Sequence, residues 1–254
     1  MRFIFILFLL VASSSAWSQA SEKYHSPLSG FYKAEDLFEK EQYSAARKEF
    51  RLFITDYKGS KNDPYYIKAL YYEGLSALEL FNNDAIDLLE TFNREYPESI
   101  YRSNILFQIG RYYYQKKDYK RSIDYFKKLN RSTVDKENQE EYYFKLGYAY
   151  FDEKMYPESK MAFHEVKDSS SQYGAPSLYY YSHICYLDSS YQTALEGFEK
   201  LMIDTRFNRV VPYYITQIYY IQHKYQEVVD FAPGKVDSLK PAEQVEISHI
   251  IGDS

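Results

Sequence analysis

The hydrophobic and polar residues of the chain follow a helical pattern in which one short phrase recurs. An aromatic residue is followed three positions later by a small residue, and four positions after that by phenylalanine. Residues four apart lie on the same face of an α-helix, so the small residue and the phenylalanine point toward the same neighbour. We expect a helix at each copy of the phrase, at residues 43–50, 119–126, 156–163 and 191–198.

Each phrase is preceded by another small residue, twelve positions before its own small residue. These upstream residues, called markers below, are Ala34, Gly110, Gly147 and Ser182. A small residue on each of two facing helices allows their backbones to approach closely. The pattern therefore predicts pairs of antiparallel helices, each with a marker on its first helix and the phrase on its second.

The markers recur along the chain at a nearly constant interval. With Gly74, Thr216 and Gly252 added, the successive differences between marker numbers are 40, 36, 37, 35, 34 and 36. A period of this length, with small and aromatic residues in phase, is typical of helical repeats, in which each pair buries its apolar face only by stacking on its neighbours. The pattern predicts an all-α solenoid that forms one domain.

Polar segments rich in turn-forming residues separate the expected pairs, for example at 59–64 and 168–174. We therefore divide residues 21–254 into six repeats and part of a seventh. The repeats are expected at about 27–66, 67–102, 103–139, 140–174, 175–208 and 209–244, with the partial repeat at 245–254. The last residues would form only part of a first helix, so we expect this sequence to be the N-terminal piece of a longer protein.

Residues around the markers and phrases resemble the tetratricopeptide repeat family, whose first helix carries Leu-Gly and a tyrosine and whose second carries Ala, Phe and Pro. The matching first-helix residues are Ile109-Gly110 with Tyr113, Leu146-Gly147 with Tyr150, and Ile251-Gly252. Pro97 ends the second repeat where the family often places proline. The resemblance covers residues from about 27 onward and implies a right-handed superhelix of antiparallel helix pairs, similar to long multi-repeat envelope proteins of Gram-negative bacteria.

Two repeats depart from the family pattern in their second helices. In the second repeat, Ala85 and Leu89 come one residue early. In the sixth repeat, Val228 and Ala232 stand where the other repeats have a small residue and phenylalanine. The resemblance is therefore carried mainly by the remaining repeats.

The first residues of the chain have the composition of a secretory signal peptide. A positive charge at Arg2 precedes a short apolar run at 3–11, and small residues follow at the cleavage-site spacing before Ser21. The run is about half as long as a membrane-spanning helix needs, which favours cleavage over an uncleaved anchor. We expect residues 1–20 to be removed and the chain to be exported, periplasmic or outer-membrane associated, without a stable membrane span.

Composition and motifs argue against several functional classes. The formal net charge is −5 at pH 7 with both signs interspersed, so no basic face for nucleic acid is expected. The one cysteine, Cys185, occupies a first-helix position that other repeats give to tyrosine, which favours a buried packing role and excludes an internal disulfide. The histidines are scattered, and phosphate-loop, nucleophile-elbow and zinc motifs are missing. We expect no catalytic, cofactor-binding or metal-binding residues in this segment; an enzyme domain beyond Ser254 is an open alternative.

Aromatic residues at two first-helix positions are the candidate partner-binding residues. In the family, the positions three before and four after the marker tend to face the concave surface of the superhelix. Carried onto this sequence, these positions hold Phe107, Tyr114, Phe144, Phe151, Tyr179, Tyr186, Tyr213 and Tyr220. Such a row of flat apolar faces with hydroxyl rims would suit an extended peptide or a glycan. The alternative is that the rings only fill the gap between successive first helices.

The resemblance and the signal peptide together favour a non-catalytic scaffold that binds protein or peptide partners of the cell envelope through its concave face. The alternative is a glycan- or peptide-binding protein of an outer-membrane uptake system, although such proteins are usually anchored through a lipid-bearing cysteine that this leader lacks. Family members that hold acidic chaperone tails use Lys, Asn and Arg along the groove. That clamp is not expected here, because the residues after the markers are Glu35, Leu75, Arg111, Tyr148, His183 and Gln217.

Overall fold

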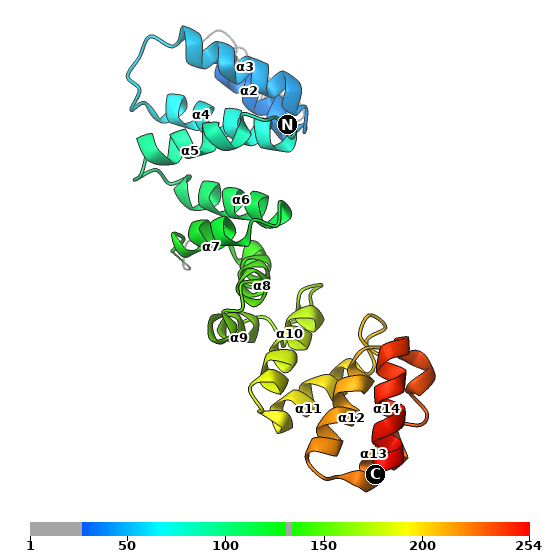
Figure 1. Cartoon of the computed structure of the whole chain (residues 1–254). Coiled ribbons are helices and arrows are strands. Elements are labelled where there is room, and N and C mark those ends of the chain that lie inside the picture. The colour runs from blue at the N-terminus through cyan, green and yellow to red at the C-terminus, as the bar shows by residue number, and fades with distance from the viewer. Residues whose placement is uncertain (1–26, 131–133) are drawn as a thin grey trace, which may run out of the picture. The chain divides into compact units, whose positions relative to one another are not determined.

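The structure, a computed structural model, describes residues 27–130 and 134–254, so the predicted signal peptide lies outside the described residues. The described residues form thirteen α-helices and a short 3₁₀-helix, η2 (Val236–Ser238), with no strand among them (Figure 1). The α-helices are α2 (Ser29–Glu39), α3 (Tyr43–Asp56), α4 (Pro64–Glu79), α5 (Ala85–Glu95), α6 (Arg102–Gln115), α7 (Tyr119–Lys127), α8 (Lys136–Asp152), α9 (Tyr156–His164), α10 (Gly174–Leu187), α11 (Tyr191–Leu201), α12 (Val211–Ile221), α13 (Tyr225–Phe231) and α14 (Pro241–Asp253).

The helices belong to two compact parts of the chain, one that ends at Ile105 and one that begins at Leu106. The first part holds α2 to α5 and the start of α6, and the second holds the rest of α6 and α7 to α14. Consecutive helices pack in pairs, α2 with α3, α4 with α5, and so on to α12 with α13. The predicted all-helical fold of stacked antiparallel helix pairs is confirmed.

A turn of the same kind joins the two helices of every pair. In the fourth pair, the Lys154 N–H donates to the carbonyl of Phe151 at 3.0 Å, and the Met155 N–H donates to that of Tyr150 at 2.8 Å. These two hydrogen bonds form the Schellman motif, which needs a left-handed residue just after the helix, and Lys154 has a φ of 59°. The left-handed residue lies seven positions after each of the first six markers, at Glu41, Phe81, Lys117, Lys154, Ser189 and His223.

The marker glycines allow the two helices of a pair to touch. A β-carbon at Gly110 would lie 2.5 Å from Cε1 of Phe126, and one at Gly147 would lie 2.9 Å from Cδ1 of Phe163. Both distances are well inside van der Waals contact, so glycine leaves the room that the phenylalanine of the second helix occupies. In the fourth pair the small residue of the phrase adds a hydrogen bond, from Ser159 Oγ to the carbonyl of Gly147 at 2.8 Å.

The two pairs that depart from the repeat pattern bury other apolar side chains in their second helices. In the second pair, a β-carbon at Gly74 would lie 2.6 Å from Cδ2 of Leu89, which is fully buried. In the sixth pair, Val228 and Ala232 are fully buried and pack with Ile247 of α14. The helix pair therefore tolerates other apolar side chains where the phrase has phenylalanine.

Local sequence signals set where the helices begin. The Asp63 Oδ1 accepts a hydrogen bond from the Tyr65 N–H at 2.8 Å, and Pro64 takes the first helical position of α4. This helix therefore begins within the segment 27–66 that we assigned to the first repeat. Similarly, α8 begins at Lys136, ahead of the expected boundary at 140. The polar segments 59–64 and 168–174 lie between helix pairs except for their last residues, which begin α4 and α10.

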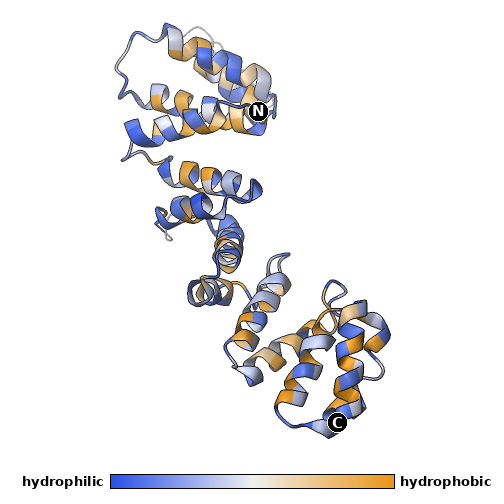
Figure 2. Cartoon of the chain, in the orientation of Figure 1, coloured by the Kyte–Doolittle hydropathy of each residue, from blue (hydrophilic) through white to orange (hydrophobic). Residues whose placement is uncertain are grey.

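Buried residues form a series of clusters between neighbouring helices instead of one central core. One cluster joins α2, α3 and α4, another joins α6, α7 and α8, and a third joins α10, α11 and α12. Figure 2 shows hydrophobic and hydrophilic residues mixed along the helices. Within residues 27–130 and 134–254, no helix combines the length and the apolar composition that crossing a membrane requires.

Candidate functional site

The phenylalanine of a second helix lies between two aromatic rings. In the fourth pair, Phe163 contacts Phe144 of its own first helix, with ring centroids 6.1 Å apart. On its other side it stacks on Tyr180 of the next first helix, at 5.3 Å and an interplanar angle of 12°. The first and fifth pairs repeat this arrangement around Phe50 and Phe198. The residue three before the marker therefore packs within its own pair.

The first set of candidate residues comprises those three positions before a marker, and the contact with phenylalanine explains their burial. Phe107 is 2% exposed and packs on the phenylalanine of its own pair, so it belongs to the core and offers no surface to a partner. Phe144 and Tyr179 are half-buried by the same kind of contact. Tyr213 is also half-buried, and its hydroxyl donates to Glu246 at 2.8 Å.

The second set of candidate residues, those four positions after a marker, is half-buried throughout. Each of these rings contacts the aromatic residue that begins its own second helix, with centroids 5.7 to 6.0 Å apart. The pairs are Tyr114 with Tyr119, Phe151 with Tyr156, Tyr186 with Tyr191, and Tyr220 with Tyr225.

The same rings also reach the next first helix. Tyr114 contacts Tyr148 at 5.8 Å between centroids, and Phe151 contacts His183 at 5.6 Å. Tyr186 contacts Tyr214 at 5.4 Å, and its hydroxyl donates to Gln217 Oε1 at 2.6 Å. Rings at this position therefore connect successive pairs.

Together these contacts form a continuous row of rings, which we call the aromatic ladder. Its members are Tyr114, Tyr148, Phe151, Tyr180, His183, Tyr186 and Tyr214, all half-buried. Four members were not among the predicted partner-binding residues: Tyr148 and His183, each directly after a marker, and Tyr180 and Tyr214. The signal that could have found Tyr180 and Tyr214 is their common position two before the marker, where an aromatic residue also stacks on the preceding phenylalanine.

The aromatic ladder carries little charge at neutral pH. Burial raises the pKa of Tyr180 to about 12 and also raises the pKa of Tyr114 and Tyr186 above the ordinary value. Burial lowers the pKa of His183, so its imidazole is neutral at pH 7. The surface therefore presents ring edges and hydroxyl groups.

Charged groups lie beside one end of the ladder, where one carboxylate pairs with two cations. Arg111 pairs with Glu141 at 2.7 Å, and Lys145 pairs with the same carboxylate at 2.8 Å. The Lys145 ammonium also lies over the Tyr114 ring, 5.1 Å from its centroid. This cluster ties α6 to α8 and fixes the rim of the ladder, because each charge has a partner.

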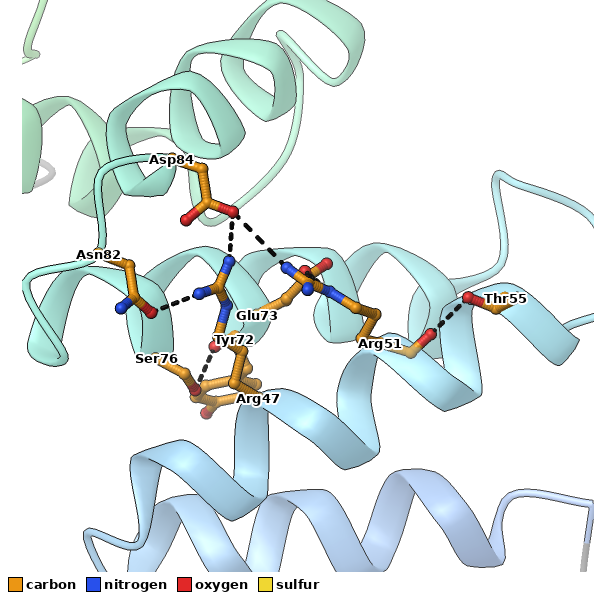
Figure 3. Close-up of polar contacts among 8 residues, drawn as sticks. All are labelled: Arg47, Arg51, Thr55, Tyr72, Glu73, Ser76, Asn82 and Asp84. Carbon is orange, nitrogen blue, oxygen red and sulfur yellow. Dashed lines mark hydrogen bonds and ion pairs between the residues drawn. The ribbon is translucent and has the colours of Figure 1, made fainter.

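A second polar cluster lies in the first part of the chain, between α3, α4 and α5 (Figure 3). Arg47 reaches Asn82 and Asp84, and Arg51 pairs with Glu73 at 3.0 Å. Two arginines side by side would attract an anionic ligand if their charges were free. Here Asp84 and the buried Glu73 already compensate them, so the cluster joins the first two helix pairs.

An apolar groove of about 830 Å³ lies between α9 and α10. Its walls include Tyr156, Tyr181, Met161 and Leu187, and the last two are 66% and 47% exposed. The sequence analysis did not anticipate it. A signal was present, because Met161 and Leu187 are large apolar residues at positions where helices of this chain usually face solvent.

The remaining candidates for chemical function are the single cysteine and clusters of metal-ligating residues. Cys185 is fully buried in the cluster of α10 to α12, and burial raises the pKa of its thiol above the ordinary value. In the described part of the chain, no three or more His, Cys, Asp or Glu residues come together in a way that could hold a metal ion.

Comparisons with known proteins identify the fold. Residues 68–99, which lie in the second helix pair, match the tetratricopeptide repeat family. No curated protein matches the chain at a significant level. The solved C-terminal part of a tetratricopeptide repeat-containing protein from Cytophaga hutchinsonii has a TM-score of 0.57 and 19% identity, over 94% of this chain and 99% of that one.

A tetratricopeptide repeat protein from Parabacteroides merdae is also similar, with a TM-score of 0.53 and 12% identity, over 91% of this chain and 86% of that one. Likeness at these identities establishes fold and not activity. The chain is therefore similar in fold to tetratricopeptide repeat proteins, and its residues 68–99 match that family in sequence.

Proposed function

We propose that the chain is a non-catalytic scaffold and that an extended segment of a partner protein binds across its aromatic ladder. The ladder is the observation that carries this proposal. Its rings come from successive first helices, from Tyr114 to Tyr214, and each is half-buried. Folds of this kind generally serve as protein-interaction scaffolds, because stacked pairs present an extended surface.

The contacts between the rings favour binding as well as packing. Each ladder ring already touches one or two others, so it loses little side-chain entropy when a partner covers its exposed edge. The hydrogen bond from Tyr186 to Gln217 also holds a hydroxyl and an amide in place beside the rings. A partner segment with apolar or aromatic side chains and a free backbone would match both features.

We further propose that the chain works in the cell envelope, as an exported, periplasmic or outer-membrane-associated protein. The support is the leader at residues 1–20, with its charge, short apolar run and small residues. Its partners would then be envelope proteins. The alternative partner is a glycan, since exposed tyrosine faces also stack on sugar rings.

Photocrosslinking in the native cell tests the proposal. A photoreactive phenylalanine analogue would replace Tyr114, Phe151 or Tyr186, where an aromatic ring already exists. Matched controls would carry the same analogue at the exposed second-helix positions Glu158 and Gln192. We expect envelope proteins to be captured from the ladder positions and not from the controls.

Two other results would contradict the protein-binding proposal. Equal capture from ladder and control positions would mean that the ladder is only internal packing. Absence of protein adducts, together with saturable binding of envelope oligosaccharides to the purified chain, would favour the glycan alternative. In that case, Tyr148→Ala should weaken oligosaccharide binding more than replacement of an exposed tyrosine outside the ladder, such as Tyr225→Ala.

A further inference from the structure

Positive charge borders the aromatic ladder on the side of α6 and α8. Lys145 lies two positions before its marker, the position that holds Tyr180 and Tyr214 in later pairs. Arg111 directly follows its marker, as Tyr148 does one pair later. The two cations therefore occupy positions that hold ladder rings in the pairs that follow.

These two cations share a single carboxylate. Glu141 pairs with Arg111 at 2.7 Å and with Lys145 at 2.8 Å, so two positive charges minus one negative leave one positive charge. Arg111 keeps 34% of its side chain exposed, and the Lys145 ammonium lies 5.1 Å from the centroid of the Tyr114 ring. A bound partner would therefore meet a positive charge beside the first ring of the ladder.

Negative charge borders the ladder on the side of α12 and α14. The Tyr186 hydroxyl donates to Gln217 Oε1 at 2.6 Å, and the Gln217 amide donates to the carboxylate of Glu246 at 2.6 Å. The Tyr213 hydroxyl donates to the same carboxylate at 2.8 Å. All of these donors are uncharged, so they hold the exposed Glu246 side chain in place without compensating its charge.

The two carboxylates hold equivalent positions in the repeat. Glu141 and Glu246 both lie six positions before a marker. Each bonds the residue that directly follows the preceding marker, which is Arg111 in one case and Gln217 in the other. The difference in sign between the two sides of the ladder therefore comes from the cations around Glu141 and the neutral groups around Glu246.

The separation of the two charges sets the length of a matching partner. From the α6–α8 contact to the α12–α14 contact there are three steps between successive first helices. At roughly 8–10 Å a step and about 3.3 Å per residue of extended chain, these steps correspond to about eight residues. The rings between the two charges are neutral at pH 7, as described above.

We propose that the ladder binds its partner segment in a fixed orientation, with an acidic residue at Arg111, a basic residue at Glu246 about eight positions away, and apolar or aromatic residues between them. This inference rests on the proposed function, because it describes the partner of the same surface. Complementary charges at the rim of an interface fix the register of the partner and accelerate its association. Salt should therefore slow the association.

Selection from a random peptide library tests the inference. Phage-displayed peptides of about twelve residues, long enough to cover both charges, would be selected on the purified chain. We expect the enriched peptides to share an acidic and a basic residue separated mainly by apolar residues. One enriched peptide, labelled with a fluorophore, would then be titrated with the chain and its variants and followed by anisotropy.

Charge variants make the titration specific. Glu246→Lys should weaken binding of the peptide by at least about fivefold, because attraction becomes repulsion. Replacing the basic residue of the peptide by glutamate should then restore binding to this variant. Arg111→Gln should also weaken binding, because Lys145 then balances Glu141. The matched control is Glu196→Lys, at an exposed position of α11, which should change nothing. Circular dichroism would verify that each variant is folded.

Enriched peptides that share no charges, or equal affinity of the peptide for the chain and for Glu246→Lys, would overturn the inference. If Tyr148→Ala still weakened binding of such peptides, the proposed function of the ladder would stand without this charge pattern. If no enriched peptide were weakened by Tyr148→Ala, both the inference and binding of peptides across the ladder would be wrong.

Discussion

At the scale of single residues, the markers are limited by the volume of the side chain that faces them. Gly110 faces Phe126, a fully buried ring that is held on its other sides by Phe107 and Tyr142. The ring has no free direction in which to move. Even one added carbon at Gly110 must therefore push the two helices apart.

We expect Gly110→Ala to reduce the free energy of unfolding by about 1–3 kcal/mol, because overpacking outweighs the gain in helix propensity. Urea unfolding followed by circular dichroism would measure it. The matched control is Gly252→Ala, whose β-carbon would meet nothing within 4 Å. That substitution should be neutral or stabilise slightly, and equal losses at both positions would contradict the steric explanation.

The left-handed turn residues create the opposite situation, in which glycine would suit the backbone better than the residue present. Lys154 has a φ of 59° and an exposed side chain. We expect Lys154→Gly to stabilise the chain by about 0.5–1 kcal/mol, since a β-carbon is strained in this conformation. Lys48→Gly, at an exposed position in the interior of α3, should instead cost about 0.5–1 kcal/mol. Thermal melts of the two variants should shift in opposite directions.

At the scale of helices, the sequence predicted pairing well because pairing depends on residues close in the chain. A marker and its phrase lie on adjacent helices, so their spacing determines which faces meet. The sequence predicted less well which side chains are exposed. Phe107 and Tyr114 are seven residues apart in one helix and looked equivalent, yet Phe107 packs within its pair and is buried. Tyr114 instead packs against the next pair and keeps an exposed edge.

In the second part of the chain, a phenylalanine ring packed between two helix pairs should contribute strongly to the free energy of unfolding. Phe163 is fully buried and contacts Phe144 and Tyr180. We expect Phe163→Ala to cost about 3–5 kcal/mol by leaving a cavity. Hydrogen exchange should increase in α8, α9 and α10 more than in distant helices, because repeats transmit losses mainly to neighbours.

Met161 provides the control for this prediction. It lies two residues away on the same helix and is 66% exposed. Met161→Ala should change the stability by less than about 0.5 kcal/mol. If Met161→Ala reduced stability as much as Phe163→Ala, then the groove beside Met161, and not the stacked ring, would hold the two pairs together.

At the scale of the whole molecule, features that arise from distant side chains escaped prediction. The groove between α9 and α10 needs side chains of both helices and a gap between them, and neither is visible in a single periodic pattern. The ladder was anticipated in part, at Tyr114, Phe151 and Tyr186. Its other members emerged because the stacking of one pair on the next determines which ring edges meet.

The many buried tyrosines should make the chain sensitive to alkali. Burial raises the pKa of Tyr180 and Tyr213 to about 12, from an ordinary value of 10.0, with the nearby Glu246 adding to the effect at Tyr213. The folded state therefore holds these protons more tightly than the unfolded state. Their contribution to stability should be complete below pH 10 and should be lost as the pH rises from 10 through 12.

Urea midpoints at several pH values and phenolate absorbance would check this prediction. The midpoint should fall above pH 10, and part of the phenolate signal of the folded chain should titrate later than that of the unfolded chain. A Tyr180→Phe, Tyr213→Phe double variant should lose less stability over the same range. Titration of all phenols together near pH 10 in the folded chain would contradict the prediction that burial protects these tyrosines.

The two classes of connector differ in how they can change length. Within five of the six pairs the connector has three residues, as at 153–155, and its hydrogen bonds fix the spacing between the two helices. Between pairs the connectors differ, from 96–101 to the longer 165–173. An insertion after Lys154 would rotate α9 out of phase with Gly147, whereas one between pairs would leave the spacing within each pair unchanged. Evolution and protein engineering alike should therefore add loops, epitopes or tags between pairs and leave the turns inside them untouched.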